Sequence, residues 1–366
     1  MKLIYDLRIL SPHMHGMTRY GLELLKAILE LDQELGVGVL VVKPEHGELL
    51  PKDPRLVAIA CGLSPYGPRA QFTLPKILNA LRGDVYHCPF FGPPARFNGP
   101  MVVTIHDLIH LRFAGDYGLK QKYYYRFVVG PAARKARAVF TVSEHSKKDV
   151  VELLKVEPEK VLITPNGVDS RFKPLERKER QKALDELGWP EGYLLGVGNK
   201  KPHKNLLSLI KAHDILKRKM ADQAPALVLV GVKQDDFPQV KTGGDLIFSS
   251  SLDDEKLRLA YGAAAAVVMP SLYEGFGLPA LEAMASGTPV VASDQASLPE
   301  VVGQAGVLTG PEPEPLAQAL MNLLEDPGEM KRLAALGPEQ AARFTWRNSA
   351  ETALKALKTI ASHGSL

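Results

Sequence analysis

Short runs of apolar residues recur along the chain, and segments long enough to hold helices separate many of them. Most of these runs are continuous rather than alternating, which is typical of strands that are buried on both faces of a parallel sheet. In the first half they predict strands at 3–10, 37–42, 56–60, 84–88, 101–105, 138–142 and 161–164. Helical patterns lie between several of them, as at 20–31 and 146–154. This alternation predicts an open α/β sheet with right-handed crossovers.

A polar, basic stretch follows residue 168, and the pattern then starts again. The second series predicts strands at 193–197, 226–230, 246–248, 266–269, 289–292 and 306–308. Residues 344–360 are helical by spacing. A chain of 366 residues is too long for one ordinary domain. We therefore expect two doubly wound domains joined near residues 168–176.

Charge and cysteine content narrow the function classes. The 45 Lys and Arg residues exceed the 41 Asp and Glu residues by only four, too few to indicate nucleic-acid binding without clustering. The two cysteines cannot form a disulfide framework, so a reducing, cytoplasmic compartment is expected. Asp6 and Arg8 interrupt any signal-peptide core, and no apolar run reaches the length of about 20 residues that spans a bilayer.

Several common site signatures are absent from the sequence. It has no Walker A segment, no Gly-x-Ser-x-Gly turn and no Asp-x-Asp pair, and Gly196 and Gly198 lack the third glycine of the dinucleotide fingerprint. The pairs His13/His15 and His106/His110 have the spacing of metal ligands, but no cysteine or carboxylate cluster accompanies them. We therefore expect no metal site and no cofactor.

A glycine-rich segment follows the strand predicted at 266–269 and leads into a helix that should end near Gly287. Gly275 and Gly277 permit a tight turn, and the amides near Gly277 and Leu278 precede the helix, which is a geometry that binds phosphate. Glu274 lies before the helix and Glu282 within it, so two carboxylates could contact separate parts of one ligand. The same pattern also fits a well-capped core helix with surface glutamates.

A basic segment, 198–205, follows the strand predicted at 193–197 and contains Lys200, Lys201 and Lys204. Lysines at the carboxyl end of a parallel strand suit an anionic ligand, although a solvated loop would look the same. Both segments should lie at one edge of a sheet. Helix amides and ammonium groups together are what a nucleotide diphosphate needs when no metal is present.

The first half places fewer chemical groups at the corresponding edge. His106 and Asp107 follow the strand predicted at 101–105, and the loop 11–19, with Gly16, joins the first strand to the first helix. An isolated histidine in such a position is often structural. The sequence 143–146 is typical of a helix N-cap, and 166–169 of a turn.

At these residues the sequence resembles the family 4 retaining glycosyltransferases, which have the GT-B architecture. The match runs over nearly the whole chain and is most specific at Glu274 and Glu282, two glutamates separated by seven residues. It also includes Gly16 and the segments 102–107, 141–146, 166–169, 204–205 and 297–301. The resemblance implies two Rossmann-like domains that face each other across a cleft. Their expected bounds are 1–170 on the acceptor side and 171–345 on the donor side, with 346–366 as a helix returning to the first domain.

The resemblance also implies roles for individual residues. The donor would be a nucleotide-diphospho-sugar, either GDP-mannose or a UDP-hexose. Glu282 would bind the ribose and Glu274 the donor sugar, while Lys204 and the amides of Phe276, Gly277 and Leu278 would face the diphosphate. The expected donor-binding set is Gly16, Asn199, Lys200, Lys204, Glu274, Gly275, Phe276, Gly277, Leu278 and Glu282, and the expected catalytic set is His106, Asp107, Glu274 and Lys204.

One position departs from the family pattern. Many members have arginine directly after the glycine that corresponds to Gly198, whereas this chain has Asn199. Lys200 or Lys201 would have to supply the second cation, and an ammonium group lacks the bidentate fork of arginine.

The acceptor is expected to be a glycan or a lipid-linked sugar, as in cell-surface polysaccharide synthesis. Residues 119–137 carry six basic and four aromatic side chains and no acid. This stretch could rest on an anionic bilayer, as a peripheral contact at the inner face of the membrane, or form a partly buried helix with a solvated basic face. Two other functions fit the same motifs: a GT-B sugar-nucleotide epimerase and a non-catalytic nucleotide-sugar-binding subunit.

Overall fold

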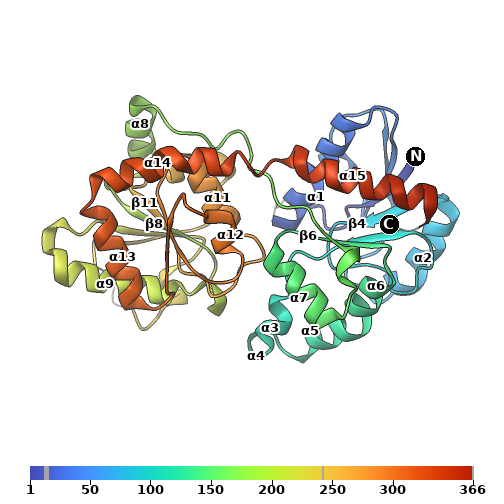
Figure 1. Cartoon of the computed structure of the whole chain (residues 1–366), viewed down its shortest axis with the longest axis horizontal. Coiled ribbons are helices and arrows are strands. Elements are labelled where there is room, and N and C mark those ends of the chain that lie inside the picture. Colours follow the sequence, from blue (N-terminus) through green and yellow to red (C-terminus); the bar gives the residue numbers. More distant parts are fainter. Residues whose placement is uncertain (12–15, 241–242, 365–366) are drawn as a thin grey trace. The chain divides into compact units, whose positions relative to one another are not determined.

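The computed structural model describes residues 1–11, 16–240 and 243–364. The chain forms two compact units: unit 1 is Met1–Gly167 with Thr345–Leu366, and unit 2 is Val168–Phe344. Each unit contains one parallel sheet with helices on both sides of it (Figure 1). The predicted α/β class with two doubly wound sheets is confirmed.

The sheet of unit 1 has seven strands in the order β3-β2-β1-β4-β5-β6-β7. Their bounds are β1 (Lys2–Asp6), β2 (Gly36–Val41), β3 (Leu56–Ala60), β4 (Val85–Cys88), β5 (Met101–Thr104), β6 (Ala138–Thr141) and β7 (Val161–Ile163). All neighbouring strands are parallel, and Ile4 of β1 lies opposite Gly38 on one side and Tyr86 on the other. The central strands β4, β5 and β6 are buried along their whole length, which explains their continuous apolar pattern.

Helices connect these strands, and the helix bounds are α1 (Gly16–Leu31), α2 (Ala70–Leu81), α3 (Ile109–Arg112), α4 (Ala114–Tyr117), α5 (Leu119–Tyr124), α6 (Gly130–Lys135), α7 (Glu144–Leu154) and α15 (Trp346–His363). A π-helical turn, Tyr125–Val129, joins α5 to α6. The predicted cap before α7 is present, because the Ser143 hydroxyl oxygen accepts a hydrogen bond from the Ser146 N–H at 3.0 Å.

The sheet of unit 2 has six parallel strands in the order β10-β9-β8-β11-β12-β13. The strands are β8 (Leu194–Val197), β9 (Leu227–Val230), β10 (Leu246–Ser249), β11 (Ala266–Met269), β12 (Val290–Ser293) and β13 (Val307–Thr309). The helices are α8 (Arg177–Leu187), α9 (Leu206–Met220), α10 (Asp254–Ala263), α11 (Leu278–Ala285), α12 (Leu298–Val302), α13 (Pro313–Leu324) and α14 (Pro327–Ala341). Within each sheet, the carboxyl ends of all strands therefore lie at the same edge of that sheet.

One local expectation differs from the structure, and one stretch without an expectation has a defined fold. The first apolar run predicts a strand to residue 10, but β1 ends at Asp6, and Leu7, Ile9 and Leu10 are buried in the following loop instead. The polar stretch after residue 176 is helical: it forms α8, where the N–H of Glu176 donates to the Glu179 carboxylate at 3.2 Å. The helix buries Ala183 and Leu184, so two apolar side chains suffice to hold a mostly polar helix on unit 2.

Unit 2 is an insertion in the chain of unit 1. The chain leaves unit 1 after Gly167 and returns at Thr345, and the N–H of Val168 donates to the carbonyl of Phe344 at 3.1 Å. Beyond the return, α15 packs beside α1, with the Trp346 ring 5.8 Å from the Tyr20 ring (Figure 1). Unit 1 therefore contains the last described helix as well as the first.

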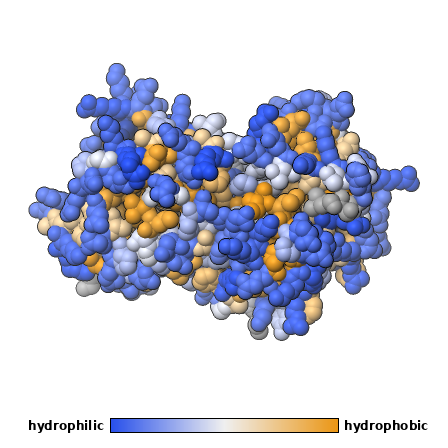
Figure 2. All heavy atoms as spheres, in the orientation of Figure 1, coloured by the Kyte–Doolittle hydropathy of each residue, from blue (hydrophilic) through white to orange (hydrophobic). Residues whose placement is uncertain are grey.

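Hydrophilic residues cover most of the face drawn in Figure 2, and hydrophobic residues gather in small patches. Among the described helices, none is long and apolar enough to cross a membrane.

Candidate active site

Two loops of unit 2 meet at the carboxyl edge of its sheet. One follows β8 and the other follows β11, and these two strands are parallel neighbours. The loops contact each other directly, because the N–H of Leu272 donates to the carbonyl of His203 at 2.7 Å. The basic segment and the glycine-rich segment are therefore adjacent in space.

The charged groups of the two loops form an ion pair. Nζ of Lys204 lies 2.7 Å from Oε1 of Glu274, and the Ser271 hydroxyl donates to the same oxygen at 2.7 Å. Both side chains are largely buried, with 16% of Lys204 and 11% of Glu274 exposed. Among the described residues no hydrogen bond reaches Oε2 of Glu274, so this carboxylate oxygen can still accept one.

Asn205 holds Lys204 in this position. Its side-chain amide donates to the carbonyls of Pro270 and Pro311 at 3.0 and 2.8 Å, and its oxygen accepts from the Ser208 hydroxyl at 2.7 Å. The backbone at Asn205 has a φ of +53°, which asparagine tolerates better than most residues. The residue after Lys204 thus ties the basic loop to the end of β11.

The glycine-rich turn leads directly into α11. Gly277 has a φ of +108°, and a Cβ there would come within 2.8 Å of the Leu298 side chain, so the position requires glycine. The helix begins at Leu278, where the first N–H groups have no carbonyl partner within the helix. The Ser297 hydroxyl lies 3.0 Å from the carbonyl of Glu274 and 2.8 Å from that of Phe276, and so fixes the turn.

The remaining predicted residues of this segment differ in what they can offer. The Phe276 ring packs edge-on against Phe344 at 5.5 Å, so only its backbone is available to a ligand. Glu282 lies within α11 and is only 5% exposed. Burial of a carboxylate on a core helix is costly, which argues against the alternative of a surface glutamate.

Asn199 and Lys200 are engaged outside the ion pair. The Asn199 side chain accepts from the N–H of Lys201 at 3.0 Å, so it shapes the loop. Lys200 is 70% exposed and lies 3.0 Å from Asp236, which follows β9. Hydrogen bonding from the Lys233 N–H, and then the Lys200 ammonium, lowers the pKa of Asp236. The structure thus places Lys200 on the β9 side of the loop.

In unit 1, His106 lies just past the end of β5 and is held from three sides. Its Nε2 donates to the carbonyl of Pro89 at 2.9 Å, because a carbonyl oxygen can only accept. The Ser146 hydroxyl donates to the carbonyl of His106 at 3.0 Å, and the Tyr20 ring lies edge-on at 4.7 Å. Both the imidazole and the peptide group of His106 therefore have fixed orientations.

Asp107 and Gly16 flank this histidine in different ways. The Asp107 carboxylate accepts from the N–H of Ile109 at 3.1 Å at the start of α3. Gly16 is the first residue of α1, and a Cβ there would meet no heavy atom of the described residues within 4 Å. His13 and His15 of the same loop lie outside the described residues.

Comparison with known families accounts for both units. Residues 14–172 match the family described as glycosyltransferase family 4, and residues 179–361 match the one described as glycosyl transferases group 1. An O-antigen chain mannosyltransferase B of Escherichia coli is 30% identical, and the alignment covers 98% of this chain and all of that one. The chain belongs to the group 1 (family 4) glycosyltransferases.

Other relatives of this glycosyltransferase agree with the assignment. An MMP alpha-(1->4)-mannosyltransferase of Mycolicibacterium hassiacum is 34% identical over 63% of this chain and 56% of its own. The structure of Anabaena HepE in complex with UDP-glucose superposes with a TM-score of 0.76 at 18% identity, over 98% of this chain and all of that one. The fold is GT-B, and as a member of this family the protein is a retaining glycosyltransferase.

The sequence does not reveal the buried ion pair in unit 1 of this glycosyltransferase. Arg8 and Asp6 form an ion pair of 2.7 Å at the end of β1, and neither side chain is exposed. The Tyr86 hydroxyl also donates to Asp6 at 2.5 Å, and burial followed by the charge of Asp6 raises the pKa of that tyrosine. In the sequence these charges only interrupt an apolar run, and no local pattern marks them as partners.

The serines around Glu274 were missed as well. Ser271 lies three residues before Glu274, and Ser297 lies in the segment 297–301 that carries the family resemblance. Their hydroxyl contacts depend on how the loops fold. The sequence does not show this, because serines are common in loops of any conformation.

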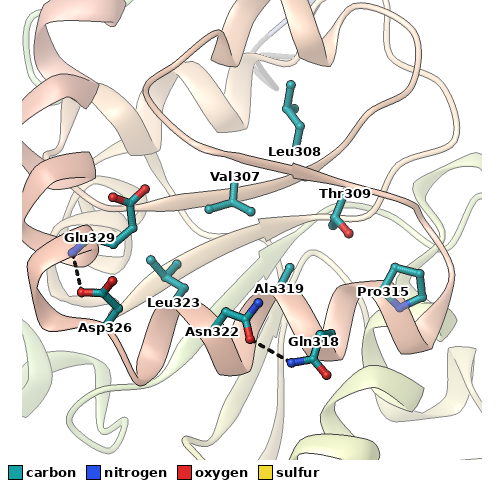
Figure 3. Close-up of a pocket in the computed structure, with 10 residues that line it drawn as sticks. All are labelled: Val307, Leu308, Thr309, Pro315, Gln318, Ala319, Asn322, Leu323, Asp326 and Glu329. Carbon is teal, nitrogen blue, oxygen red and sulfur yellow. Dashed lines mark hydrogen bonds between the residues drawn. The ribbon is translucent and has the colours of Figure 1, made fainter.

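A pocket of about 420 Å³ lies elsewhere in unit 2, between the edge strand β13 and α13 (Figure 3). Its wall includes Val307, Ala319 and Leu323, and its polar groups bond to one another, as Gln318 does to Asn322 (Figure 3). None of the predicted site residues lines it. In the described ranges no group of three or more histidines, cysteines and carboxylates could hold a metal ion.

Proposed function

We propose that this glycosyltransferase transfers a mannosyl residue from GDP-mannose to a hydroxyl of a cell-surface glycan, with unit 2 holding the donor and unit 1 the acceptor. The observation that carries the donor site is the contact of Lys204 and Ser271 with Glu274 at the edge of the sheet. The name of the E. coli relative, an O-antigen chain mannosyltransferase, supports mannose as the sugar and a surface glycan as the acceptor.

The proposed site acts mainly through electrostatics. When the bond between the anomeric carbon and the phosphate oxygen breaks, its electron pair passes to the diphosphate, where negative charge grows. Lys204 and the N–H groups of Gly277 and Leu278 stabilise this charge more strongly in the transition state than in the ground state. No metal ion is needed in this scheme. Gly275 and the backbone of Phe276 complete the turn that binds the diphosphate, and Lys200 contributes a more distant positive charge.

The two glutamates would bind different parts of the donor. Oε2 of Glu274 accepts a hydroxyl of the donor sugar, while Oε1 keeps its bonds to Lys204 and Ser271. Glu282 accepts the ribose hydroxyls from its position inside α11. Asn199 keeps the basic loop in shape through its bond to Lys201 rather than binding the diphosphate.

Unit 1 would supply the groups near the anomeric carbon. The peptide group of His106 is fixed by Ser146 and its ring by Pro89, so its dipole is oriented before positive charge develops on the sugar. Asp107 holds the start of α3. Gly16 lets the diphosphate approach α1 without a side chain in the way. The acceptor oxygen bonds to the anomeric carbon on the face that the phosphate leaves, and its proton passes to a phosphate oxygen.

Thermal-shift measurements with GDP-mannose, UDP-glucose and ADP-glucose, with and without EDTA, test the donor. A ligand that binds the folded state raises its stability, so GDP-mannose should raise the melting temperature most, and EDTA should not change the shift. Glu282→Ala should lower GDP-mannose affinity about tenfold or more, whereas the exposed Glu314→Gln should leave it unchanged. A larger shift with UDP-glucose would reassign the base, and equal affinity in both variants would reject the role of Glu282.

Product analysis separates the transferase from its alternatives. Incubation of GDP-mannose with a mannosylated acceptor should give an extended glycan and GDP. Release of an isomerised sugar nucleotide would identify an epimerase, and binding without turnover would identify a non-catalytic subunit.

We further propose that unit 1 contacts the inner face of a membrane through residues 119–137. Tyr123 and Phe127 are 52% and 63% exposed and stack on each other at 6.1 Å, and the Arg126 guanidinium lies 5.5 Å from the Phe127 ring. Exposed aromatic rings beside basic groups are typical of interfacial binding. Flotation with vesicles containing anionic lipid should capture the protein but not the Tyr123→Ser/Phe127→Ser variant. Failure of the unaltered protein to bind at low salt would reject the contact.

A further inference from the structure

Unit 1 contains a pocket of about 560 Å³ that the proposed catalytic groups do not use. Aromatic rings form its walls: Tyr66 stacks on Phe91 at 5.9 Å and meets Tyr124 edge-on at 6.2 Å, and Phe91 lies 6.0 Å from Tyr125. We call this the aromatic pocket. Its volume is within the range of about 300–1,000 Å³ that is typical of ligand sites.

The elements that line the aromatic pocket are those that hold His106. Phe91 comes two residues after Pro89, whose carbonyl binds the His106 ring. Met17 lines the pocket from the first turn of α1, and Tyr20, one turn later, packs against the His106 ring. His110, on α3, lines the pocket four residues after His106. A ligand in the pocket is therefore held next to the histidine.

Polar groups lie among the aromatic faces. His110, Lys120 and Gln121 line the pocket, and none of the described residues that line it is acidic. The Tyr124 hydroxyl is buried, and no group of the described residues forms a hydrogen bond with it, which is costly unless a ligand does so. Apolar faces combined with a few polar groups, one of them unsatisfied, suit a ring that has both C–H faces and hydroxyls. A hydrocarbon chain would leave the Tyr124 hydroxyl unsatisfied.

We propose that the aromatic pocket binds a neutral pyranose ring of the acceptor glycan, so that the adjoining hydroxyl lies beside His106. This inference rests on the proposed function, because it assigns the acceptor of the same reaction. The C–H face of the sugar stacks on the rings of Tyr66 and Phe91, and a sugar hydroxyl bonds to the Tyr124 hydroxyl. The pocket thereby selects a sugar ring over a lipid chain.

Saturation-transfer NMR with α-linked mannotriose tests binding without relying on catalysis. The unaltered full-length protein should bind mannotriose, and Tyr66→Ala and Phe91→Leu should each weaken binding about fivefold to tenfold. Tyr124→Phe removes only the hydroxyl and should weaken mannotriose binding without loss of stability. The matched control is Phe72→Ala, an exposed aromatic residue of α2 that lies outside the pocket, which should bind like the unaltered protein.

Kinetics with the same acceptor provide the second readout. In the pocket variants the KM for mannotriose should rise, and a larger share of the donor sugar should pass to water instead of the glycan. The proposal is overturned if mannotriose does not bind the unaltered protein, if all variants bind it equally, or if farnesyl phosphate occupies the pocket in its place. Mannotriose binding without turnover of any sugar nucleotide would instead contradict the proposed function and leave the pocket assignment standing.

Discussion

The carboxyl edges of the two sheets carry opposite kinds of chemistry. In unit 2, Lys204 and Glu274 form an ion pair that keeps some exposure, and Lys200 is largely exposed beside it. In unit 1, Arg8 and Asp6 are completely buried and neutralise each other, while the open surface is lined by aromatic rings. A charged residue at the end of a strand is therefore not in itself a ligand group, because exposure and existing partners decide whether its charge is available. The contrast fits an anionic donor on unit 2 and an uncharged acceptor on unit 1.

The buried pair of unit 1 should give the largest effect. Arg8→Met leaves the Asp6 charge without its partner in the interior and should lower the free energy of unfolding of unit 1 by about 3–5 kcal/mol. Urea unfolding followed by circular dichroism measures this, with allowance for separate transitions of the two units. The double variant Asp6→Asn/Arg8→Met should recover much of the loss. A single variant as stable as the unaltered protein would show that the pair is hydrated, and the two edges would then resemble each other.

The corresponding ion pair of unit 2 should matter for turnover instead. Lys204→Met removes the cation nearest the proposed diphosphate and should lower kcat about 10²–10³-fold, with a smaller change in donor affinity. Lys200→Met is the matched control, because Lys200 is exposed and paired with Asp236, and it should cost less than about tenfold. Equal losses in the two variants would contradict the assignment of Lys204 to the leaving group.

A smaller effect is expected in the pH dependence of the stability of unit 1, because a histidine is buried in its interior. His87 packs between Tyr5 and Phe140, with Nε2 bonded to Thr104. Burial, and then the charge of His106, lowers its pKa to about 3, from an ordinary value of 6.5. The unfolded chain takes up a proton below pH 6.5 and the folded protein does not, so this stability is present above pH 6.5 and declines as the pH falls toward 3. The decline is about 1.4 kcal/mol per pH unit.

The variant His87→Gln checks this pH dependence. Urea unfolding at pH 7.5, 5.5 and 4.5 should show a shallower pH dependence in the variant than in the unaltered protein. The same slope in both proteins would assign the acid sensitivity to other groups.

Much of the fold follows from the sequence because parallel strands buried on both faces need continuous apolar runs. The run 266–269 is a strand with the same bounds in the structure. Sequence and structure differ where a buried run is not a strand, since Leu7, Ile9 and Leu10 lie in a loop. The stretch that forms α8 shows little apolar pattern because only Ala183 and Leu184 of this helix are buried.

The candidate site was predictable in composition but not in its contacts. Gly277 and the start of α11 are visible in the sequence because the turn requires glycine. The ion pair of Lys204 and Glu274 is not, since it depends on β8 and β11 being neighbours, although β9 and β10 lie between them in the chain. The hydrogen bond from Tyr86 to Asp6 is not visible in the sequence for the same reason, because β4 lies beside β1 only in the folded sheet.

The placement of α15 has a consequence for biosynthesis. Because the ribosome produces α15 after all of unit 2, the first half of the chain emerges without the helix that covers α1, and must wait for it. The inserted unit has all its strands in one uninterrupted stretch and is free to finish first. During translation, then, the part of the protein that starts earliest is completed last.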